Sequence, residues 1–238
     1  MNINLNFSGV PTIIQCNLMN PGITNNLQCP TNTTNIRLNF SQKLCPDSYI
    51  GEIKNNNGLG WTNTAAGNPV NANTVVNYSS INKENNYLIL ILESPHFYEY
   101  DINSKDALGP AQGKTGNNIK NYLIDCLNTN NQIKGLFTKG YEVVVLNAVQ
   151  YQCSQGISPL KQGVRDKNFS HFWGNGFSND LIDRINAFSN GNNNLIIVDA
   201  CTRKLKLKLV EPALSASLTH YISTHPSSWW SPKNRYIK

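Results

Sequence analysis

The sequence is poor in charged side chains, and its cysteines lack the spacing of a metal site. Only 14% of the 238 residues are Asp, Glu, Lys or Arg, so Asn, Ser and Thr supply much of the polarity. The six cysteines include no C-x-x-C pair, the usual spacing of zinc and iron–sulfur ligands. We therefore expect no metal, no metal cluster and no cofactor.

The sequence also lacks a long apolar run and a secretion signal. No apolar stretch reaches the roughly 20 residues that a membrane-spanning helix requires. The start, MNINLNFSGV, has neither a basic segment nor an apolar core. These absences predict a cytoplasmic protein with reduced thiols and no membrane contact, and we expect it to be a monomer.

The chain does contain enough apolar residues for a core, and an excess of positive charge. Hydrophobic residues make up 39% of the sequence, which at this length suits one domain with a sizeable core. The formal net charge of +6 favours an anionic partner such as DNA, although many basic proteins bind no nucleic acid. The late cationic residues are Arg203, Lys204, Lys206, Lys208, Lys233, Arg235 and Lys238.

Residues 1–80 differ in composition from the rest of the chain. They are rich in Asn, Thr, Gly and Pro and show no clear hydrophobic periodicity. Segments 6–18 and 35–44 have the composition of short strands, whereas 52–74 has that of a long loop. We predict an irregular or β-rich N-terminal extension, packed on a domain formed by residues 81–238.

Apolar runs begin at residue 87. The three continuous runs are YLILIL (87–92), YEVVVL (141–146) and NLIIVDA (194–200), and a weaker run is LTHYIST (218–224). Continuous apolar residues are typical of strands that are buried on both faces, as in a parallel sheet. The runs therefore predict four strands of a mostly parallel sheet.

Helical patterns separate these runs. The clearest are TGNNIKNYLIDCLN (115–128) and SNDLIDRINAFS (178–189), the second with Ser178 as a candidate N-cap. The alternation of strands and helices predicts an α/β protein with three layers, α/β/α, around a central four-stranded sheet. TRKLKLKLVEP (202–212) alternates like a half-exposed strand, but we predict a helix because a strand has just ended.

Polar side chains stand at the ends of three of the predicted strands. Glu93 follows the first run, Asn147 ends the second and His225 follows the weaker fourth. In open parallel sheets, ligands bind outside the carboxyl ends of the strands. We therefore expect an acid, an amide and an imidazole to converge on one cleft.

The segment GPAQGKTG (109–116) is similar to a phosphate-binding P-loop but departs from it twice. A P-loop has four residues between its first glycine and Gly-Lys-Thr, and here only three separate Gly109 from Gly113. A P-loop also follows its strand directly, whereas the first run ends near Leu92. We therefore do not interpret this segment as a nucleotide-hydrolase motif.

With these residues in hand, the chain resembles the uracil-DNA glycosylase superfamily, and most closely its family-4 type. The matching segments are LESPH (92–96), GPAQGKTG (109–116), LNAVQYQC (146–153) and THPSSWW (224–230), which follow one another in the family's order. The resemblance covers about residues 87–235. It gives no account of residues 1–80.

The resemblance implies roles for single residues. Glu93 takes the place of the family's catalytic acid, and His225 that of its catalytic histidine. Asn147 takes the place of the asparagine that reads the base, and Ala111 that of the aromatic residue that stacks on it. The other expected base-binding residues are Ser94, His96 and Gln112.

The sequence departs from the family at points that affect the expected pocket. His96 replaces a glycine, and the family's iron–sulfur cysteines have no counterpart. Ala111 in place of an aromatic residue leaves two alternatives open. Either the pocket is enlarged for a modified pyrimidine, or another ring fills the gap, the candidates being Phe97, Tyr98 and Tyr151.

Cleavage of the glycosidic bond leaves positive charge on the sugar and negative charge on the base. Glu93 would stabilise the cation and orient water, and His225 would donate a hydrogen bond to the departing base. The alternatives are a surface carboxylate and a structural histidine. Asn147 reads a uracil-like edge in one amide orientation and a cytosine-like edge in the other, or is a turn residue at a strand end.

Small, aromatic and cationic residues are the expected DNA contacts. Ser227 and Ser228 would let backbone amides approach a phosphate, and Trp229 or Trp230 would wedge into the base stack, with a core position as the alternative. The other candidates are Lys114, Thr115, Arg203 and Lys204. Lys206 and Lys208 either contact phosphate or lie on a solvated face. SHFWGNGF (170–177) is either a DNA-facing loop or a packed insert.

These observations together predict a monofunctional DNA glycosylase that flips a pyrimidine out of DNA. The expected base is uracil or a bulky modified pyrimidine, such as the glucosylated hydroxymethylcytosine of phage DNA, which would suit antiviral defence. No lysine occupies a matched strand end, so we expect no lyase activity. The alternatives are a non-catalytic DNA- or base-binding module on the same fold and a nucleoside or nucleotide hydrolase.

Overall fold

The computed structural model describes one strand pair near the start of the chain and most residues from 43 onwards. The described residues are 2–7, 10–15, 43–55, 58–63, 74–101, 103–104, 106–137, 139–153, 162–189 and 195–238. The strand predicted over 35–44 lies outside this set, apart from Lys43 and Leu44.

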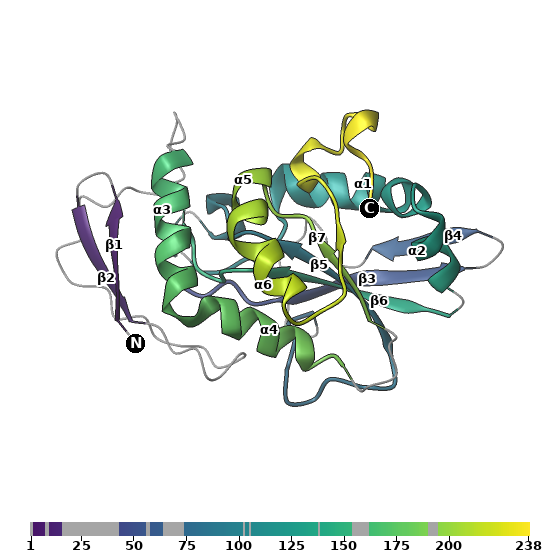
Figure 1. Ribbon diagram of the computed structural model, residues 1–238, viewed down its shortest axis with the longest axis horizontal. Coiled ribbons are helices and arrows are strands. Elements are labelled where there is room, and N and C mark those ends of the chain that lie inside the picture. Colours follow the sequence, from purple (N-terminus) through teal and green to yellow (C-terminus); the bar gives the residue numbers. More distant parts are fainter. Residues whose placement is uncertain are drawn as a thin grey trace.

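The centre of the protein is a six-stranded sheet in the order β4-β3-β6-β5-β7-β8 (Figure 1). Its four parallel strands are β5 (Asn86–Leu92), β6 (Tyr141–Asn147), β7 (Leu195–Asp199) and β8 (Tyr221–Ile222). Two further strands, β3 (Ser48–Asn55) and β4 (Leu59–Asn63), continue the sheet beside β6 in antiparallel pairing. The predicted α/β class and mostly parallel sheet are confirmed.

The predicted number of four strands is wrong, because β3 and β4 also join the sheet. They lie in the part of the chain for which the sequence predicts an extension and a loop. β3 buries Ile50 and Ile53, which are three residues apart rather than two or four. A bulge shifts its pairing with β6 between Tyr49 and Gly51, and this irregularity breaks the alternation by which a half-buried strand is recognised.

The strand β5 explains why a continuous apolar run marks the centre of the sheet. Ile89 and Ile91 pack into the core on one face, whereas Leu88 and Leu90 pack into the core on the other. All seven residues of β5 are buried. A strand that is covered on both faces requires apolar side chains at every position.

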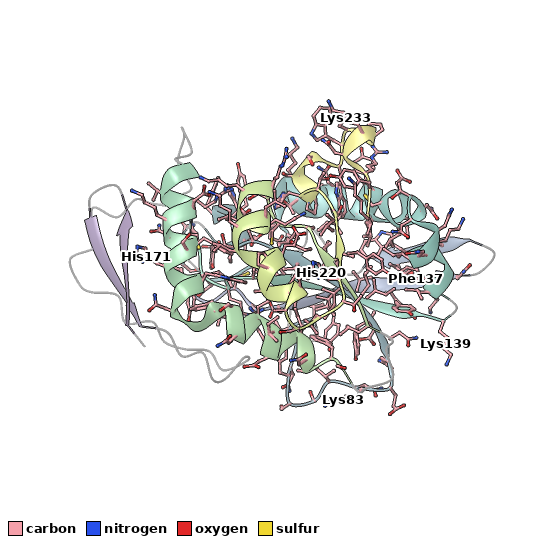
Figure 2. All side chains as sticks on the ribbon, viewed as in Figure 1. Lys83, Phe137, Lys139, His171, His220 and Lys233 are labelled. Carbon is pink, nitrogen blue, oxygen red and sulfur yellow. The ribbon has the colours of Figure 1, made fainter. Side chains whose placement is uncertain are left out.

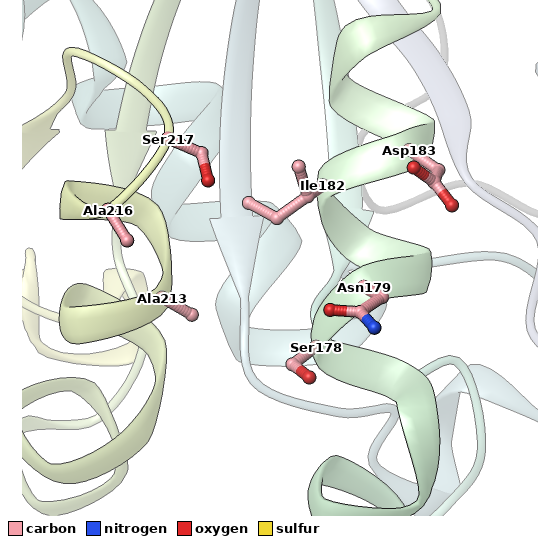
Figure 3. Close-up of a pocket in the computed structure, with 7 residues that line it drawn as sticks. All are labelled: Ser178, Asn179, Ile182, Asp183, Ala213, Ala216 and Ser217. Atoms are coloured by element: carbon pink, nitrogen blue, oxygen red, sulfur yellow. The ribbon is translucent and has the colours of Figure 1, made fainter.

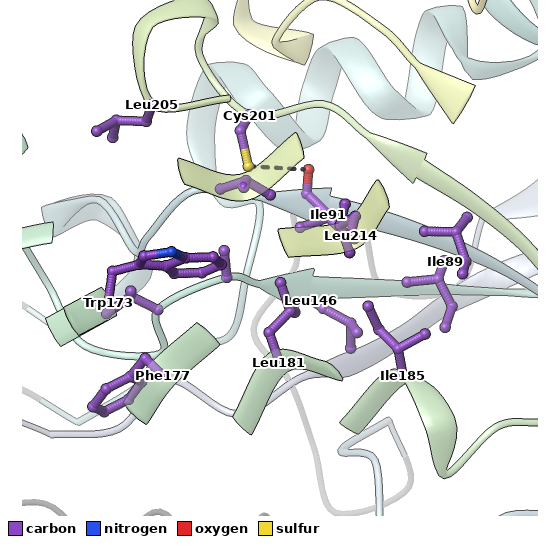
Figure 4. Packing of buried hydrophobic residues seen from close by; sticks show 14 of the residues in the cluster. Ile89, Ile91, Leu146, Trp173, Phe177, Leu181, Ile185, Cys201, Leu205 and Leu214 are labelled. Carbon is purple, nitrogen blue, oxygen red and sulfur yellow. Dashed lines mark hydrogen bonds between the residues drawn. The ribbon is translucent and has the colours of Figure 1, made fainter. Parts of the chain in front are cut away.

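Helices cover both faces of the sheet. One face carries α1 (Gly113–Asn128) and α2 (Asn131–Leu136), and the other carries α3 (Gln162–Phe172), α4 (Ser178–Asn186), α5 (Arg203–Leu205) and α6 (Glu211–Ser215). Side chains fill the space between the sheet and the helices (Figure 2). Figure 4 shows the core on the α4 face, where Leu181 and Ile185 lie close to Leu146 and Ile89. None of the described helices is long and apolar enough to cross a membrane.

The helices predicted over 115–128 and 178–189 are confirmed as α1 and α4, but the predicted N-cap of α4 is wrong. The chain passes from α3 into α4 through the turn Trp173–Phe177, in which Asn175 and Gly176 have non-helical backbone angles. Phe177 is the N-cap of α4, and Ser178 is the first residue of the helix. Gly176 in this turn has a φ of 103°, a conformation that a side chain disfavours. The glycine therefore permits the bend between α3 and α4.

Two open alternatives of the sequence are decided by the structure. Trp173 and Phe177 are buried, so the segment 170–177 is a packed insert. The segment 202–212 is helical, since α5 continues through the wide turn Lys206–Val210 into α6. The helix predicted there is confirmed. A helix suits this position because the segment connects two parallel strands.

The first described strands form a separate unit of secondary structure. β1 (Asn2–Phe7) and β2 (Val10–Gln15) pair as an antiparallel hairpin that does not join the six-stranded sheet. In Figure 1 this hairpin lies beside α3.

Candidate active site

The order of the parallel strands locates the site. The chain runs from β5 outward to β6 and then returns to β7, on the other side of β5. At such a switch point the connecting helices leave on opposite faces of the sheet, and a crevice forms at the carboxyl ends of the strands. Glu93 follows β5 directly and Thr202 lies three residues after the end of β7, so both lie at the carboxyl ends of the strands that flank this switch point.

Both carboxylate oxygens of Glu93 are bound. Oε1 accepts a hydrogen bond from Nη1 of Arg165 on α3 at 2.8 Å. Oε2 accepts from the backbone N–H of Thr202 at 3.1 Å and from the Thr202 hydroxyl. The Glu93 side chain is only 9% exposed, and these bonds replace the water that the charge has lost. The carboxylate is thus held in one position at the switch point.

Arg165 links Glu93 to a longer chain of alternating charges. Its Nε and Nη2 donate to Oδ1 of Asp166 at 3.0 and 2.7 Å, and Lys204 donates to the other oxygen of Asp166. Burial works against the charge of Arg165, but the fields of Glu93 and Asp166 outweigh it and raise the pKa of the guanidinium. Arg165 therefore stays a cation between two carboxylates.

His225 is held as a neutral ring with a defined tautomer. Its Nδ1 accepts a hydrogen bond from the backbone N–H of Ser227 at 3.2 Å, so the proton of the neutral ring is on Nε2. Burial lowers the pKa of His225 below its ordinary value of 6.5. The field of Glu93 opposes this shift, whereas the fields of Arg165 and Lys206 reinforce it. At neutral pH the ring therefore offers Nε2–H as a hydrogen-bond donor.

Asn147 ends β6 and lies beside an unexpected acid. It is 1% exposed, its Nδ2 lies 3.9 Å from the Cys45 sulfur, and its Oδ1 has no hydrogen-bond partner within the described part of the chain. The carboxyl group of Glu99 lies within hydrogen-bonding reach of the Asn147 side chain. Burial raises the pKa of Glu99 to about 8, so this acid is mostly neutral at pH 7. A base that reaches Asn147 would thus meet an amide supported by a carboxylic acid.

Ala111 supports the site through its backbone rather than its side chain. Its N–H donates to Oε1 of Glu99 at 2.9 Å, and its φ of 57° is rare for a residue with a side chain. The methyl group is fully buried in the core beside α1, in the same cluster as Leu92 and Ile119. The Ala111 side chain therefore packs in the core, while its backbone holds Glu99.

Ser94 and Gln112 lie close to the site with partners of their own. The side chain of Ser94 hydrogen-bonds the Cys153 thiol. Gln112 is the N-cap residue of α1, is half-buried, and donates from Nε2 to the Pro110 carbonyl at 3.4 Å. The side chains of Ser94 and Gln112 therefore both have hydrogen-bond partners within the protein.

His96 belongs to a cluster of three tilted rings, of which Tyr98 is exposed at the surface. The ring centroid of Phe97 lies 4.2 Å from that of His96 and 4.0 Å from that of Tyr98. His96 lies within the electrostatic fields of both Glu93 and His225, and its burial lowers its pKa. The cluster therefore presents a neutral imidazole next to the candidate catalytic residues.

The two tryptophans after His225 have opposite environments. Trp229 is fully buried and its Nε1 donates to the Thr224 carbonyl at 3.1 Å, so Trp229 takes the core position that was the alternative to a wedge. Trp230 is 59% exposed. Ser227 and Ser228 are half-buried in one 3₁₀ turn. Only Trp230 is available as a wedge.

The expected cationic contacts lie on two elements. Lys114 is exposed and Thr115 half-buried in the first turn of α1, and Arg203 and Lys204 are exposed at the start of α5. Lys208 is also exposed. Lys206 is 6% exposed and donates to the carbonyl of Ser223, so it differs from both alternatives, a phosphate contact and a solvated face.

Sequence reasoning missed Arg165, Thr202 and Glu99. Thr202 had a signal, because it follows its apolar run closely, as Glu93 and His225 follow theirs. Arg165 had none, because α3 was not predicted. Glu99 lies among aromatic residues in FYEY, a composition that indicates burial but not a role.

A surface groove lies elsewhere on the molecule, between α4 and α6 (Figure 3). Its volume is about 460 Å³, and none of the strand-end residues lines it. The lining side chains include Ser178, Ile182 and Asp183 from α4, and Ala213 from α6. The groove therefore does not belong to the candidate active site.

The ranges that the structure describes contain no group of three or more His, Cys, Asp or Glu side chains placed to hold a metal ion. Four cysteines in these ranges are buried free thiols: Cys45, Cys126, Cys153 and Cys201. Burial raises the pKa of each, so each is a neutral thiol at pH 7.

Comparison of the chain with protein-family models, with curated proteins and with solved structures gave no match. The argument for a function therefore depends on the geometry of the strand ends.

Proposed function

We propose that this protein is a monofunctional DNA glycosylase with a uracil-DNA-glycosylase-like fold. The observation that carries the proposal is the position of Glu93 and His225, which both follow the carboxyl ends of parallel strands. One is an ion-paired carboxylate, and the other is a neutral imidazole within its electrostatic field. Hydrolysis of an N-glycosidic bond needs one group for the cationic sugar and another for the departing base.

Glu93 would act on the sugar. When the bond to the base breaks, positive charge develops at the anomeric carbon, and a fixed carboxylate nearby stabilises it. The bonds from Thr202 and Arg165 keep Glu93 in place, so it does not have to reorganise during the reaction. The same carboxylate can orient the attacking water.

His225 would act on the base. The departing pyrimidine carries negative charge on its oxygen, and a hydrogen bond from Nε2–H of His225 would stabilise it. The bond from the Ser227 N–H to Nδ1 fixes this tautomer in advance. The neutral ring is a donor without needing a second proton.

Asn147 would read the base, and the neighbouring rings would hold it. The open hydrogen-bonding capacity of the Asn147 Oδ1 supports this role. Because the Ala111 methyl is buried in the core, the ring pair His96 and Phe97 is the better candidate for stacking on the base. Asn147 is nearly inaccessible, so a base can reach it only when neighbouring side chains move.

A non-catalytic DNA-binding module is the second candidate. The observation that favours it is that both Glu93 oxygens already have protein partners, as in a structural ion pair. In a binding module, the carboxylate would organise α3 and the strand ends without acting on a sugar. The two candidates differ in whether a base is released.

The test is a base-release assay on a panel of DNA substrates. Single- and double-stranded oligonucleotides containing uracil, and phage DNA containing glucosylated hydroxymethylcytosine, are incubated with the protein and treated with hot alkali, which cleaves abasic sites. Cleavage that depends on Glu93 supports a glycosylase, and the cleaved substrate identifies the base. Tight DNA binding without cleavage of any substrate contradicts the glycosylase and supports the binding module.

A further inference from the structure

Two exposed aromatic rings stand out on the surface near the candidate active site. Tyr98 is 60% exposed and Trp230 is 59% exposed, more than any other large hydrophobic side chain in the described ranges. Rings of this size lose water readily and are used in proteins for contacts with partners. They are far apart in sequence, so the fold must bring them to the same region.

The start of α1 lies between these two rings. Gly113 has a φ of 62°, and a side-chain carbon at this position would lie only 3.5 Å from the Tyr98 ring. The Tyr98 ring therefore packs directly on the backbone. The next residue, Lys114, places its Nζ 5.7 Å from the centre of the Trp230 ring. Two consecutive residues at the start of α1 thus contact the two rings, the first the Tyr98 ring and the second the Trp230 ring.

Both residues are anchored to their surroundings. The Tyr98 ring contacts the Phe97 ring in a tilted arrangement, with centroids 4.0 Å apart. The backbone of Trp230 is fixed, because its carbonyl accepts a hydrogen bond from Nη2 of Arg235 at 3.2 Å and it follows the fully buried Trp229. Holding a ring before it binds reduces the entropy that binding has to overcome.

This surface leads directly to the strand ends. Tyr98 belongs to a cluster of three tilted rings with Phe97 and His96, and His96 lies within the fields of Glu93 and His225. On the other side, Asn118 of α1 donates to the Pro226 carbonyl at 2.9 Å and so fixes the segment that carries Trp230. A strand lying across both rings would therefore pass beside the candidate active site.

We propose that Tyr98, Lys114 and Trp230 form a platform for single-stranded DNA, on which bases next to the target nucleotide stack. A single strand exposes the faces of its bases to such rings, whereas a duplex keeps them within its own stack. Lys114 and the net charge of +6 complement the phosphates. The place of the target nucleotide beside this platform rests on the proposed function, but strand binding itself does not require catalysis.

The test compares the binding of one oligonucleotide as a single strand and as a duplex. A fluorescein-labelled thymidine-rich 20-mer is titrated with the full-length chain, and fluorescence anisotropy is recorded. Tyr98→Ala and Trp230→Ala are each expected to weaken single-strand binding by about 5- to 100-fold, the usual effect of losing one base–ring stack, and to change duplex binding little. Tyr98→Phe and Trp230→Phe keep a ring and are expected to bind like the wild type.

Two further variants separate charge and surface effects. Lys114→Gln is expected to weaken single-strand binding and to reduce its salt dependence by about one phosphate contact. Leu136→Ala removes another exposed hydrophobic side chain, 44% exposed on α2, and is expected to leave binding unchanged. Equal affinity for the two DNA forms, or unchanged binding by both alanine variants, would overturn the platform.

Base release distinguishes this inference from the proposed function. If the wild type releases base from duplex DNA and the two alanine variants bind single strands normally, the platform is wrong and the glycosylase stands. If the two alanine variants lose single-strand binding while no tested DNA loses a base, the platform stands and the glycosylase is wrong. Circular dichroism of each variant confirms that a loss of binding is not a loss of fold.

Discussion

Arg165 Nη1 donates to Glu93 Oε1 at 2.8 Å, although the two residues are 72 positions apart in sequence. This contact links α3 to the carboxyl end of β5 and engages one of the two oxygens of the candidate catalytic carboxylate. The Arg165 side chain is 18% exposed and that of Glu93 is 9% exposed. An ion pair with so little access to water is sensitive to the loss of either partner.

Removal of one partner of this pair should destabilise the protein more than removal of both. Arg165→Gln leaves the Glu93 charge without its cation and is expected to cost roughly 3 kcal/mol of unfolding free energy. The double variant Glu93→Gln/Arg165→Gln is expected to recover part of this loss. Urea denaturation of the single and double variants measures the coupling, and additive effects would show that the ion pair contributes nothing.

His225 should act as a neutral donor, so base release should decline in acid. The pKa of His225 lies below 6.5, and a second proton on Nδ1 would face the Ser227 N–H donor. Activity is therefore expected to fall as the pH drops below 6.5. His225→Asn is expected to lower the rate by about 100- to 1000-fold.

The control for His225 is the pH profile of the remaining activity. In His225→Asn, the fall in activity at acidic pH that protonation of the ring causes should be absent or shifted to another pH. A profile identical in shape to that of the wild type would assign the limb to another group.

Glu99 should make the protein less stable as the pH rises. Its pKa is about 8 in the folded protein and about 4.5 when exposed, so the folded state binds more protons between these values. Stability is then lost progressively as pH rises through this window, by a total on the order of 4 kcal/mol. Glu99→Gln cannot ionise, so its unfolding free energy should not show this loss. Parallel stability curves of the two proteins from pH 5 to 9 would contradict the raised pKa.

The part of residues 1–80 that the structure describes should be required for folding of the remainder. Arg184 is fully buried, and it binds Asp47 at 2.7 Å and Asp180 at 2.8 Å. A chain shortened to 81–238 lacks Asp47 and the strands β3 and β4, and is expected not to fold. Asp47→Asn in the full chain is expected to cost about 3–5 kcal/mol. A cooperative urea transition of the shortened chain would contradict this dependence.

The elements that could be predicted are those with strong local signals. The continuous apolar runs identified β5, β6 and β7 because strands covered on both faces need apolar side chains throughout. The helix α1 has an apolar stripe and follows a glycine-rich turn, so its pattern was also visible. The strand-end positions of Glu93, Asn147 and His225 followed from the order of these elements.

The parts that could not be predicted depend on tertiary contacts. The strand β3 contains a bulge, so its hydrophobic pattern does not have the period of a strand. Lys206 and Trp229 are buried because the segments around β8 pack on them. The alternating sequence around Lys206 and the pair of tryptophans that includes Trp229 do not reveal this packing. Arg165 could not be assigned to Glu93, because a contact across 72 residues leaves no trace in local composition.

The central claim is that Glu93 and His225 together cleave an N-glycosidic bond in DNA. The most direct measurement is mass spectrometry of the free base and of abasic sites after incubation of the wild type, Glu93→Gln and His225→Asn with uracil-containing and glucosylated DNA. The account predicts equal amounts of base and abasic sites with the wild type on one of these substrates. It also predicts a loss of at least 100-fold in both variants, which remain folded. No release of base from either DNA by the wild type, or unchanged release by folded Glu93→Gln, would contradict it.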